Sequence, residues 1–141
     1  MTSDEIPTIN AETHRLADEL WAASNVAAWC ELFHPHRSRY VDPAFGEFRG
    51  RAAIQAWLAR VMRRAGSWRS RNVGARLFDG FVAAGEAELV IPLEDGELVL
   101  PFAWIQRYEE GWIVYRRDYY DTHDLRRRAS PRALAKPEAA R

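Results

Sequence analysis

Residues 79–111 read DGFVAAGEAELVIPLEDGELVLPFAWIQRYEEG and contain three acidic-glycine pairs, at Asp79-Gly80, Asp95-Gly96 and Glu110-Gly111. Such pairs are typical of tight β-hairpin turns, because glycine readily adopts the positive φ angles that these turns need. The pairs lie about 15 residues apart, and the runs between them are β-rich. This spacing predicts an antiparallel meander in one sheet wide enough to curl. Its four strands are expected at about residues 68–78, 81–92, 97–108 and 112–121.

Helical periodicity predicts three helices before the meander. Asn10 is a good N-cap for the first, over about residues 11–23. A second, short helix follows Ser24-Asn25, which can cap it, and ends before Pro35. After a short extended piece, the clearest helix begins at Gly50 and stops near Gly66.

Length and composition limit the partners to be expected. The 141 residues include 20 basic and 20 acidic side chains, so the formal net charge is zero and nucleic acid is not an expected partner. Cys30 is the single cysteine, which excludes an intrachain disulfide and favours a reducing, cytoplasmic setting. No run approaches the roughly 20 apolar residues of a membrane helix, so a soluble protein without a membrane partner is expected.

One domain is predicted over residues 1–128, because an ordinary domain of this length can bury a sizeable core. Beyond Leu125 the chain continues with three arginines and then Ala, Pro, Lys and Glu, with Leu134 as the only large apolar residue. Such a segment cannot offset its ordering entropy, so residues 129–141 are predicted to form a disordered tail.

Two segments carry a resemblance to a known superfamily. They are Tyr40-Val41-Asp42-Pro43 leading to Gly50-Arg51-Ala52-Ala53-Ile54, and Arg117-Asp118-Tyr119-Tyr120-Asp121 at the end of the last strand. With these segments and this order of elements, the chain resembles the nuclear transport factor 2-like superfamily, especially SnoaL-like polyketide cyclases and limonene-epoxide hydrolase relatives. The resemblance implies an α+β fold in which a cone-shaped, curved antiparallel sheet wraps on the N-terminal helices. It also implies a pocket between the helices and the sheet.

Asp118 is the first candidate for catalysis. By resemblance it occupies the position of a pocket carboxylate that acts as general acid or base. Strand alternation then sends four residues to its face of the sheet, namely Trp112, Val114, Arg116 and Tyr120. The alternative is a structural carboxylate paired with Arg116, Arg117 or a cation of another strand.

Tyr40 and Asp42 are the next candidates, because residues two apart on an extended segment share a face. In the epoxide-hydrolase relatives a tyrosine and an amide-bearing residue at this spacing hold the attacking water, and here Asp42 replaces the amide. A tyrosine hydroxyl can donate to a substrate oxygen, and a carboxylate can accept from water. The alternative is that Tyr40 belongs to the core and Asp42 starts the turn at Pro43.

Glu88 is a fourth candidate. The same relatives place an Arg and a second Asp, two apart, on the middle strand, and counting back from Asp118 without gaps brings these positions to Glu88 and Val90. Neither matches, so epoxide hydrolysis by that triad is not expected. Glu88 could still point into the cavity and pair with Asp118, or it could pair with Arg116.

Known cofactor motifs are lacking in the sequence. It has no phosphate loop, dinucleotide fingerprint or nucleophile elbow. The pair His34 and His36 lacks further nearby ligands, so no metal is expected, and His14 falls on the polar side of its helix, which predicts that it faces solvent. Any chemistry is therefore expected to be acid–base catalysis without a cofactor.

The leading interpretation is an enzyme that isomerises, cyclises or opens a ring in a small apolar metabolite such as a polyketide, terpenoid or steroid-like compound. Asp118 would move the proton, and Tyr40 and Asp42 would orient an oxygen. The substrate-binding residues are expected to be Trp57, Phe102, Trp104, Trp112, Arg116 and Tyr120. The alternative is a non-catalytic small-molecule-binding or dimerisation module of the same fold. A homodimer through the outer face of the sheet is expected, because the final strands carry apolar side chains on both sides.

Overall fold

The structure is a computed structural model that describes residues 1–128, so the predicted tail over residues 129–141 lies outside the described residues. The helices are α1 (Ile6–Ala22), α2 (Val26–Cys30), α3 (Arg51–Ala65) and α4 (Thr122–Arg128). The strands are β1 (Arg39–Asp42), β2 (Gly46–Arg49), β3 (Arg69–Phe78), β4 (Val82–Leu93), β5 (Gly96–Glu109) and β6 (Trp112–Tyr119). None of the helices in this described part is long and apolar enough to cross a membrane.

The predicted meander is confirmed. Strands β3 to β6 pair antiparallel in sequence order and begin and end within a few residues of the predicted bounds. Their turns use the three predicted pairs, and the glycines have positive φ, with Gly80 at 97° and Gly111 at 83°. The prediction of the third helix is also confirmed, because Gly50 precedes α3 and Gly66 follows it.

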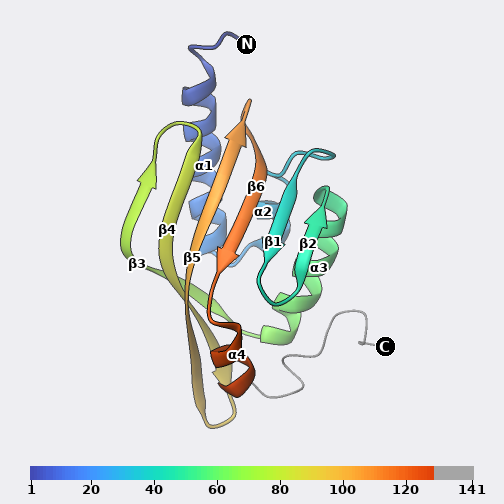
Figure 1. Ribbon diagram of the computed structural model, residues 1–141, viewed down its shortest axis with the longest axis vertical. Helices are drawn as coiled ribbons and strands as arrows, with labels where there is room; N and C mark the ends of the chain where they lie inside the picture. Colours follow the sequence, from blue (N-terminus) through green and yellow to red (C-terminus); the bar gives the residue numbers. More distant parts are fainter. Residues whose placement is uncertain (129–141) are drawn as a thin grey trace.

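Strand β1 extends the meander into a six-stranded sheet in the order β2-β1-β6-β5-β4-β3. It pairs antiparallel with β2 and parallel with β6, which sets Tyr40 beside Arg116. The sheet is curved and unclosed, and α1, α2 and α3 lie behind it in Figure 1. We call the face that these helices cover the inner face. The α+β architecture expected from the sequence is therefore confirmed.

Asn10 does not cap the first helix. Helix α1 begins at Ile6, five residues before the predicted start, with Glu5 at the N-cap and proline in the first turn, and the side chain of Asn10 is fully buried. Its Nδ2 donates to the carbonyl of Gly80 at 2.9 Å, and its Oδ1 accepts from the N–H of Gly111 at 2.8 Å. Asn10 thus ties the helix to two turns of the meander.

A bulge in β6 changes which side chains face inward. Tyr108 pairs with Ile113 whereas Arg107 pairs with Tyr115, so Val114 is an extra residue in the strand. Ile113 is therefore fully buried, while Trp112 is 36% exposed and lies beside His34 instead of in the pocket. The expectation that Trp112 shares the inward face of Asp118 is wrong for this reason.

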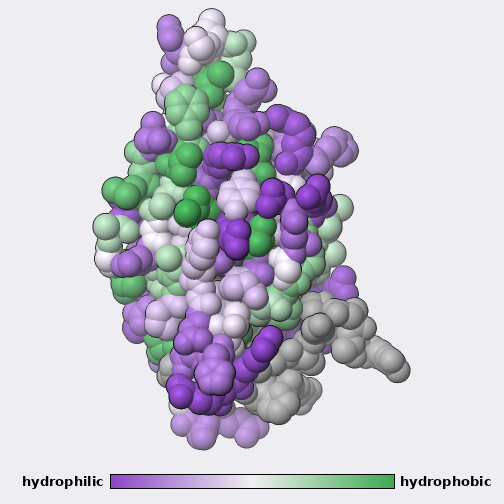
Figure 2. All heavy atoms as spheres, viewed as in Figure 1, coloured by the Kyte–Doolittle hydropathy of each residue, from purple (hydrophilic) through white to green (hydrophobic). Residues whose placement is uncertain are grey.

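The outer face of the sheet is mixed in character. Neighbouring strands align Leu77, Ala84, Ile105 and Arg117 in one row, and Leu77 and Ile105 remain exposed. Figure 2, viewed as Figure 1, shows hydrophobic residues interspersed with hydrophilic ones on this face. A homodimer through this face stays a prediction.

Candidate functional site

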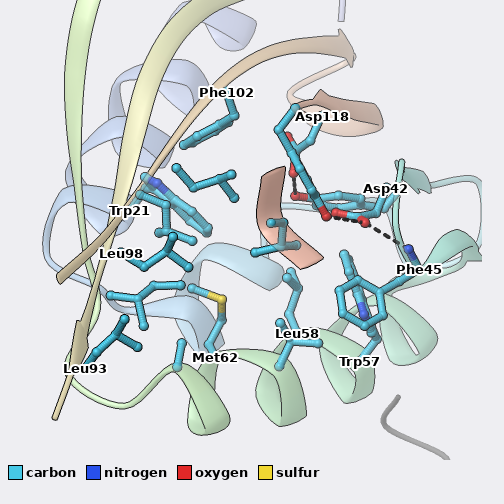
Figure 3. A pocket seen from close by; sticks show the side chains of 18 residues that line it. Trp21, Asp42, Phe45, Trp57, Leu58, Met62, Leu93, Leu98, Phe102 and Asp118 are labelled. Carbon is cyan, nitrogen blue, oxygen red and sulfur yellow. Dashed lines mark hydrogen bonds between the residues drawn. The ribbon is translucent and has the colours of Figure 1, made fainter. Parts of the chain in front are cut away.

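A pocket lies between α3 and the inner face of the sheet (Figure 3). Its empty volume is about 940 Å³, part of which is open to solvent. The wall away from the carboxylates is aliphatic and is formed by Leu58, Val61, Met62, Ala65, Leu89, Ile91, Leu93, Leu98, Leu100 and Leu125. The pocket expected between helices and sheet is thus present.

The opposite end of the pocket carries two carboxyl groups and two hydroxyl groups (Figure 3). Tyr40 and Asp42 come from β1, and Asp118 comes from β6. Tyr120 is the first residue after the end of β6. The parallel pairing of β1 with β6 brings these residues together, although they lie 78 positions apart in the chain. We call this group the polar end of the pocket.

Both oxygens of Asp118 are engaged by protein groups. Oδ1 accepts a hydrogen bond from Nε of Arg116 at 2.8 Å, and Oδ2 accepts a short one from the hydroxyl of Tyr40. Burial raises the pKa of Tyr40 well above its usual range, and the negative charge of Asp118 adds to this effect, so Tyr40 keeps its proton as a donor. Asp118 is therefore held in a buried ion pair, as the structural alternative anticipated.

Arg116 is only 5% exposed and is surrounded by aromatic rings. Its guanidinium carbon lies 4.7 Å from the ring centre of Trp104, 5.5 Å from Trp29 and 5.9 Å from Trp21. The faces of these rings stabilise a buried cation. Arg116 thus supplies Asp118 with a counter-ion from behind the pocket wall.

Asp42 is the less engaged carboxyl. Its Oδ1 accepts from the backbone N–H of Ala44 at 2.8 Å, from that of Phe45 at 3.0 Å, and from the hydroxyl of Tyr120 at 2.8 Å. Its Oδ2 accepts no hydrogen bond from the described residues. The two backbone contacts form the predicted turn at this position, and the free oxygen leaves Asp42 available to a ligand as well.

The proton affinity of Asp42 suits proton transfer near neutral pH. Burial raises its pKa from the usual 3.8 to about 6, and the negative charge of Asp118 adds to the increase. Hydrogen bonds from Tyr120, Ala44 and Phe45 oppose the increase because they stabilise the charged form. A carboxyl group with such a pKa can both accept and release a proton at neutral pH.

The predicted site residues fall into three groups. Those that line the pocket are Tyr40, Asp42, Trp57, Phe102, Asp118 and Tyr120. Arg116 and Trp104 lie behind Asp118 and line a smaller neighbouring cavity. Trp112 and Glu88 line neither cavity.

Glu88 lies on the outer face and does not pair with Asp118. It pairs with Arg71 at 3.0 Å and lies opposite Pro101 of β5. Counting back from Asp118 without gaps leads to β4, whereas the strand beside β6 is β5, on which Trp104 lies opposite Asp118. The predicted role of Glu88 in the pocket is therefore wrong.

The sequence interpretation missed a group of polar residues behind the pocket. Gln106 is 2% exposed and Tyr108 is 1% exposed, and both continue the alternating inward series of β5. His14 does not face solvent freely, because its ring stacks on Phe78 with centres 4.6 Å apart and its Nδ1 lies 2.8 Å from the hydroxyl of Tyr108. A glutamine among the alternating apolar residues of β5 was the signal that could have revealed this group.

The indole N–H of Trp57 is a buried hydrogen-bond donor without an acceptor among the described residues. The ring packs in a stacked arrangement on Phe48 and edge-on against Tyr40. Trp57 therefore contributes an aromatic wall to the pocket and packs its ring against Tyr40 of the polar end. Within residues 1–128, no group of three or more His, Cys, Asp or Glu side chains is arranged to hold a metal ion.

The fold and the mainly apolar pocket with two carboxyl groups at one end define a small α+β domain of the nuclear transport factor 2-like class. The model of the SnoaL-like domain family matches residues 13–116, and the chain belongs to this family. The superfamily predicted from the sequence is confirmed by this match. No curated protein sequence matches the chain significantly.

Solved structures share the fold at low sequence identity. The structure of TerC co-crystallised with polyporic acid has a TM-score of 0.70 and 18% identity over 84% of this chain and 96% of that one. A putative SnoaL-like polyketide cyclase from Jannaschia sp. CCS1 has a TM-score of 0.69 and 19% identity over 89% and 94% of the two chains. An M. tuberculosis epoxide hydrolase of the limonene-epoxide hydrolase-like kind has a TM-score of 0.64 and 14% identity over 85% and 88%.

Proposed function

We propose that this protein is a cofactor-independent acid–base enzyme that isomerises, cyclises or opens a ring in an apolar small molecule. The observation that carries the proposal is the free Oδ2 of Asp42 at the polar end of a pocket whose other walls are aliphatic and aromatic. A buried carboxyl with a pKa of about 6 is suited to proton transfer. The cyclase and the epoxide hydrolase among the structural relatives agree with this class of chemistry.

The two carboxyl groups have different roles in this proposal. Asp42 takes the proton from the substrate through Oδ2 and returns it at a second position, while Tyr120 keeps its carboxyl oriented. Asp118 forms an ion pair with Arg116, and its negative charge raises the pKa of Asp42. Asp118, which the sequence favoured as the proton carrier, becomes the residue that tunes the carrier.

The shape of the pocket limits the substrate. Only one end offers polar groups, so the substrate carries its reacting oxygen or acidic C–H group at one end and a large apolar body at the other. Polyketide, terpenoid and steroid-like skeletons meet this requirement. The apolar body would fill the space between Met62 of α3 and Leu98 and Leu100 of β5.

Turnover assays on a panel of epoxides, cyclisable polyketide aldehydes or esters, and β,γ-unsaturated ketosteroids test the proposal, with mass spectrometry and chiral chromatography to identify products. We expect the wild type to convert one class and the folded Asp42→Asn variant to lose the activity. Asp118→Asn should retain part of the activity and shift its pH profile. Glu88→Gln, which changes a carboxyl on the outer face, should behave as the wild type.

Two outcomes would contradict the proposal. If Asp42→Asn turns over substrate at the wild-type rate, Asp42 does not carry the proton. If the wild type converts no compound but binds several, the protein is the non-catalytic binding module that the same fold allows.

A further inference from the structure

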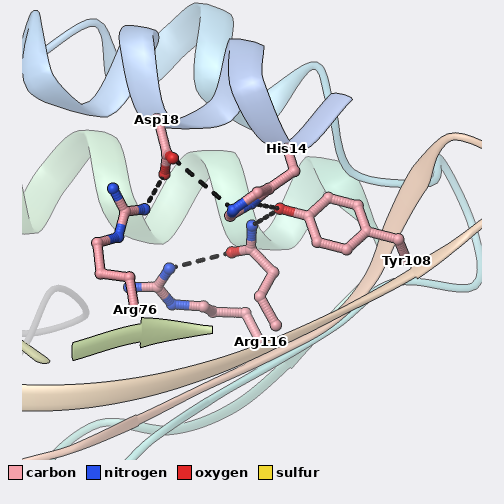
Figure 4. Close-up of polar contacts among 6 residues, drawn as sticks. His14, Asp18, Arg76, Tyr108 and Arg116 are labelled. Carbon is pink, nitrogen blue, oxygen red and sulfur yellow. Dashed lines mark hydrogen bonds and ion pairs between the residues drawn. The ribbon is translucent and has the colours of Figure 1, made fainter. Parts of the chain in front are cut away.

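A second polar cluster lies behind Asp118, beside the smaller cavity that Arg116 and Gln106 line. Figure 4 shows Arg116, Tyr108 and His14 of this cluster. Hydrogen bonds link Arg116 to Gln106, Gln106 to Tyr108, and Tyr108 to His14. The chain leads from the buried carboxylate of Asp118 on β6, across β5, to helix α1. The pocket mechanism proposed above uses none of its members beyond Arg116.

The chemistry of Arg116 sets the direction of the first two bonds in this chain. A guanidinium only donates, so the atom of Gln106 that lies 3.0 Å from Nη1 must be the carbonyl Oε1. The amide Nε2 therefore faces Tyr108 and donates to its hydroxyl oxygen at 2.7 Å. The hydroxyl hydrogen of Tyr108 is then left to point at the next member of the chain.

That next member is Nδ1 of His14, at 2.8 Å from the tyrosine hydroxyl. The arrangement in which Tyr108 donates and Nδ1 accepts gives the hydroxyl hydrogen an acceptor within the chain, and in it Nδ1 carries no proton. A neutral imidazole holds its proton on one nitrogen only, so the proton of His14 is on Nε2. This nitrogen faces Oδ2 of Asp18 at 3.7 Å.

The groups around His14 favour this neutral form. Burial lowers the pKa of His14 below its usual value, the carboxylate of Asp18 on the same helix opposes the effect, and the guanidinium of Arg76 on β3 reinforces it. Arg76 itself pairs with Asp18, which offsets much of the attraction between Asp18 and a charged imidazole. Phe78 covers one face of the ring and Tyr108 of β5 meets its edge.

We propose that Gln106 is a positioning residue for the Arg116–Asp118 pair, and that His14 ends the chain as a neutral imidazole protonated on Nε2. A proton added to Nδ1 of His14 would face the hydroxyl of Tyr108, which already accepts from Gln106. The hydroxyl hydrogen would then lose its acceptor, and the chain could not be satisfied from end to end. The placement of Arg116, and through it of Asp118, therefore depends on the charge of His14.

The variant Gln106→Glu tests this direction with almost no change in shape. A carboxylate only accepts, so it would accept from both Arg116 and Tyr108. The hydroxyl of Tyr108 would then turn its lone pair toward His14 and accept from an N–H at Nδ1. The control Gln55→Glu makes the same chemical change on helix α3, outside the chain.

Nitrogen-15 NMR of labelled histidine reads the state of His14 without any substrate. In the wild type we expect the Nε2-protonated neutral form, and in Gln106→Glu a proton on Nδ1 and a midpoint of titration raised by about one pH unit or more. The Gln55→Glu control should match the wild type. A wild-type His14 protonated on Nδ1, or an unchanged His14 in Gln106→Glu, would overturn the proposal.

The coupling between His14 and Arg116 can be measured separately, by NMR of the arginine side chain. In the wild type, the Nε–H signal of Arg116 should shift with the same pH midpoint as His14, because the chain joins them. In Tyr108→Phe, which lacks the hydroxyl link, the Arg116 signal should no longer follow His14; if it still does, the coupling is wrong. These spectra are independent of turnover, so a failure of the proposed function leaves them unaffected.

Discussion

Tyr120 donates its hydroxyl hydrogen to Oδ1 of Asp42 at 2.8 Å, and this bond works against the burial of the carboxyl. The bond favours the ionised form, whereas burial favours the protonated one. The result is a pKa of about 6, close to neutrality. Tyr120→Phe should therefore raise this value further, which a pH profile of ligand binding or turnover would reveal. A profile that stays in place or moves to lower pH would show that the bond does not control Asp42.

Asp42→Asn should stabilise the folded protein at neutral pH. The carboxyl group of Asp42 binds its proton more tightly in the folded chain than in the unfolded chain. The stability gained from this proton is therefore complete below the unfolded pKa of 3.8 and is lost as the pH rises through the folded pKa of about 6. The difference between the folded and unfolded pKa values corresponds to about 3 kcal/mol in the free energy of unfolding. This is the most stability that Asp42→Asn can gain over the wild type at about pH 8. Urea unfolding at about pH 8 and pH 4 measures it, and a gain that is larger in acid would contradict the assignment.

Arg116→Met should destabilise the fold by about 3–5 kcal/mol, because it leaves the buried carboxylate of Asp118 without its counter-ion. Asp118→Asn leaves the cation unpaired in the same way. The double variant should cost clearly less than the sum of the two, because both charges are then absent. Urea unfolding of all four proteins completes this double-mutant cycle, and additive costs would show that the two charges do not interact.

The pocket should discriminate ligands by charge. Asp118 is neutralised by Arg116, so above about pH 6 the charge of Asp42 leaves the polar end negative. Decylamine should therefore bind about tenfold tighter than decanoate at about pH 8, with decanol between them. Quenching of tryptophan fluorescence measures the affinities. The preference should shrink at about pH 5 and in Asp42→Asn, and equal binding of amine and carboxylate at high pH would contradict the charge distribution.

Asn10→Ala should cost about 2–4 kcal/mol, because it leaves the buried carbonyl of Gly80 and the half-buried N–H of Gly111 without partners. Asn25→Ala is the matched control, since Asn25 caps the short helix α2 with a single bond to the N–H of Ala28. The control should lose only about 1 kcal/mol. Chemical unfolding compares the two variants, and a smaller loss for Asn10 would rule out its role as a clamp.

The homodimer through the outer face is open to a direct measurement. Light scattering coupled to size exclusion should give a dimer for the wild type and a monomer for Ile105→Lys, because this substitution places a charge in the exposed row with Leu77. Glu94→Lys, at the exposed tip of the β4–β5 hairpin, is the control and should stay dimeric. A monomeric wild type would refute the prediction.

Local signals account for the parts of the fold that the sequence predicted. The acidic-glycine turns and the apolar stripe of α3 depend on neighbouring residues alone, so the meander and the third helix could be placed within a few residues. Strand β2 was missed because Gly46–Arg49 is short and mostly exposed, without an apolar pattern. Asn10 was misassigned because a good capping residue is equally able to bind distant backbone groups.

The wrong predictions for Trp112 and Glu88 have a common cause. Both depend on how strands pair, which neighbouring residues in the sequence do not reveal. Alternation along β6 predicted the inward side of Arg116 and Asp118 correctly, but the bulge at Val114 turned Trp112 outward. The position of Glu88 was inferred from a gapless count, which cannot reveal that β5 separates β4 from β6. The proximity of Tyr40 to Asp118 was expected only from resemblance, since a parallel pair of strands leaves no local trace in the sequence.

The parallel pairing of β1 with β6 also bears on how the protein is made. Tyr40 leaves the ribosome 78 residues before Asp118, and Asp42 leaves it 78 residues before Tyr120. The bonds from Tyr40 to Asp118 and from Tyr120 to Asp42 therefore cannot form in a nascent chain until its final strand has emerged. A chain that ends before β6 would carry most of the apolar wall but neither of these two bonds, so the polar end of the pocket assembles only once β6 is present.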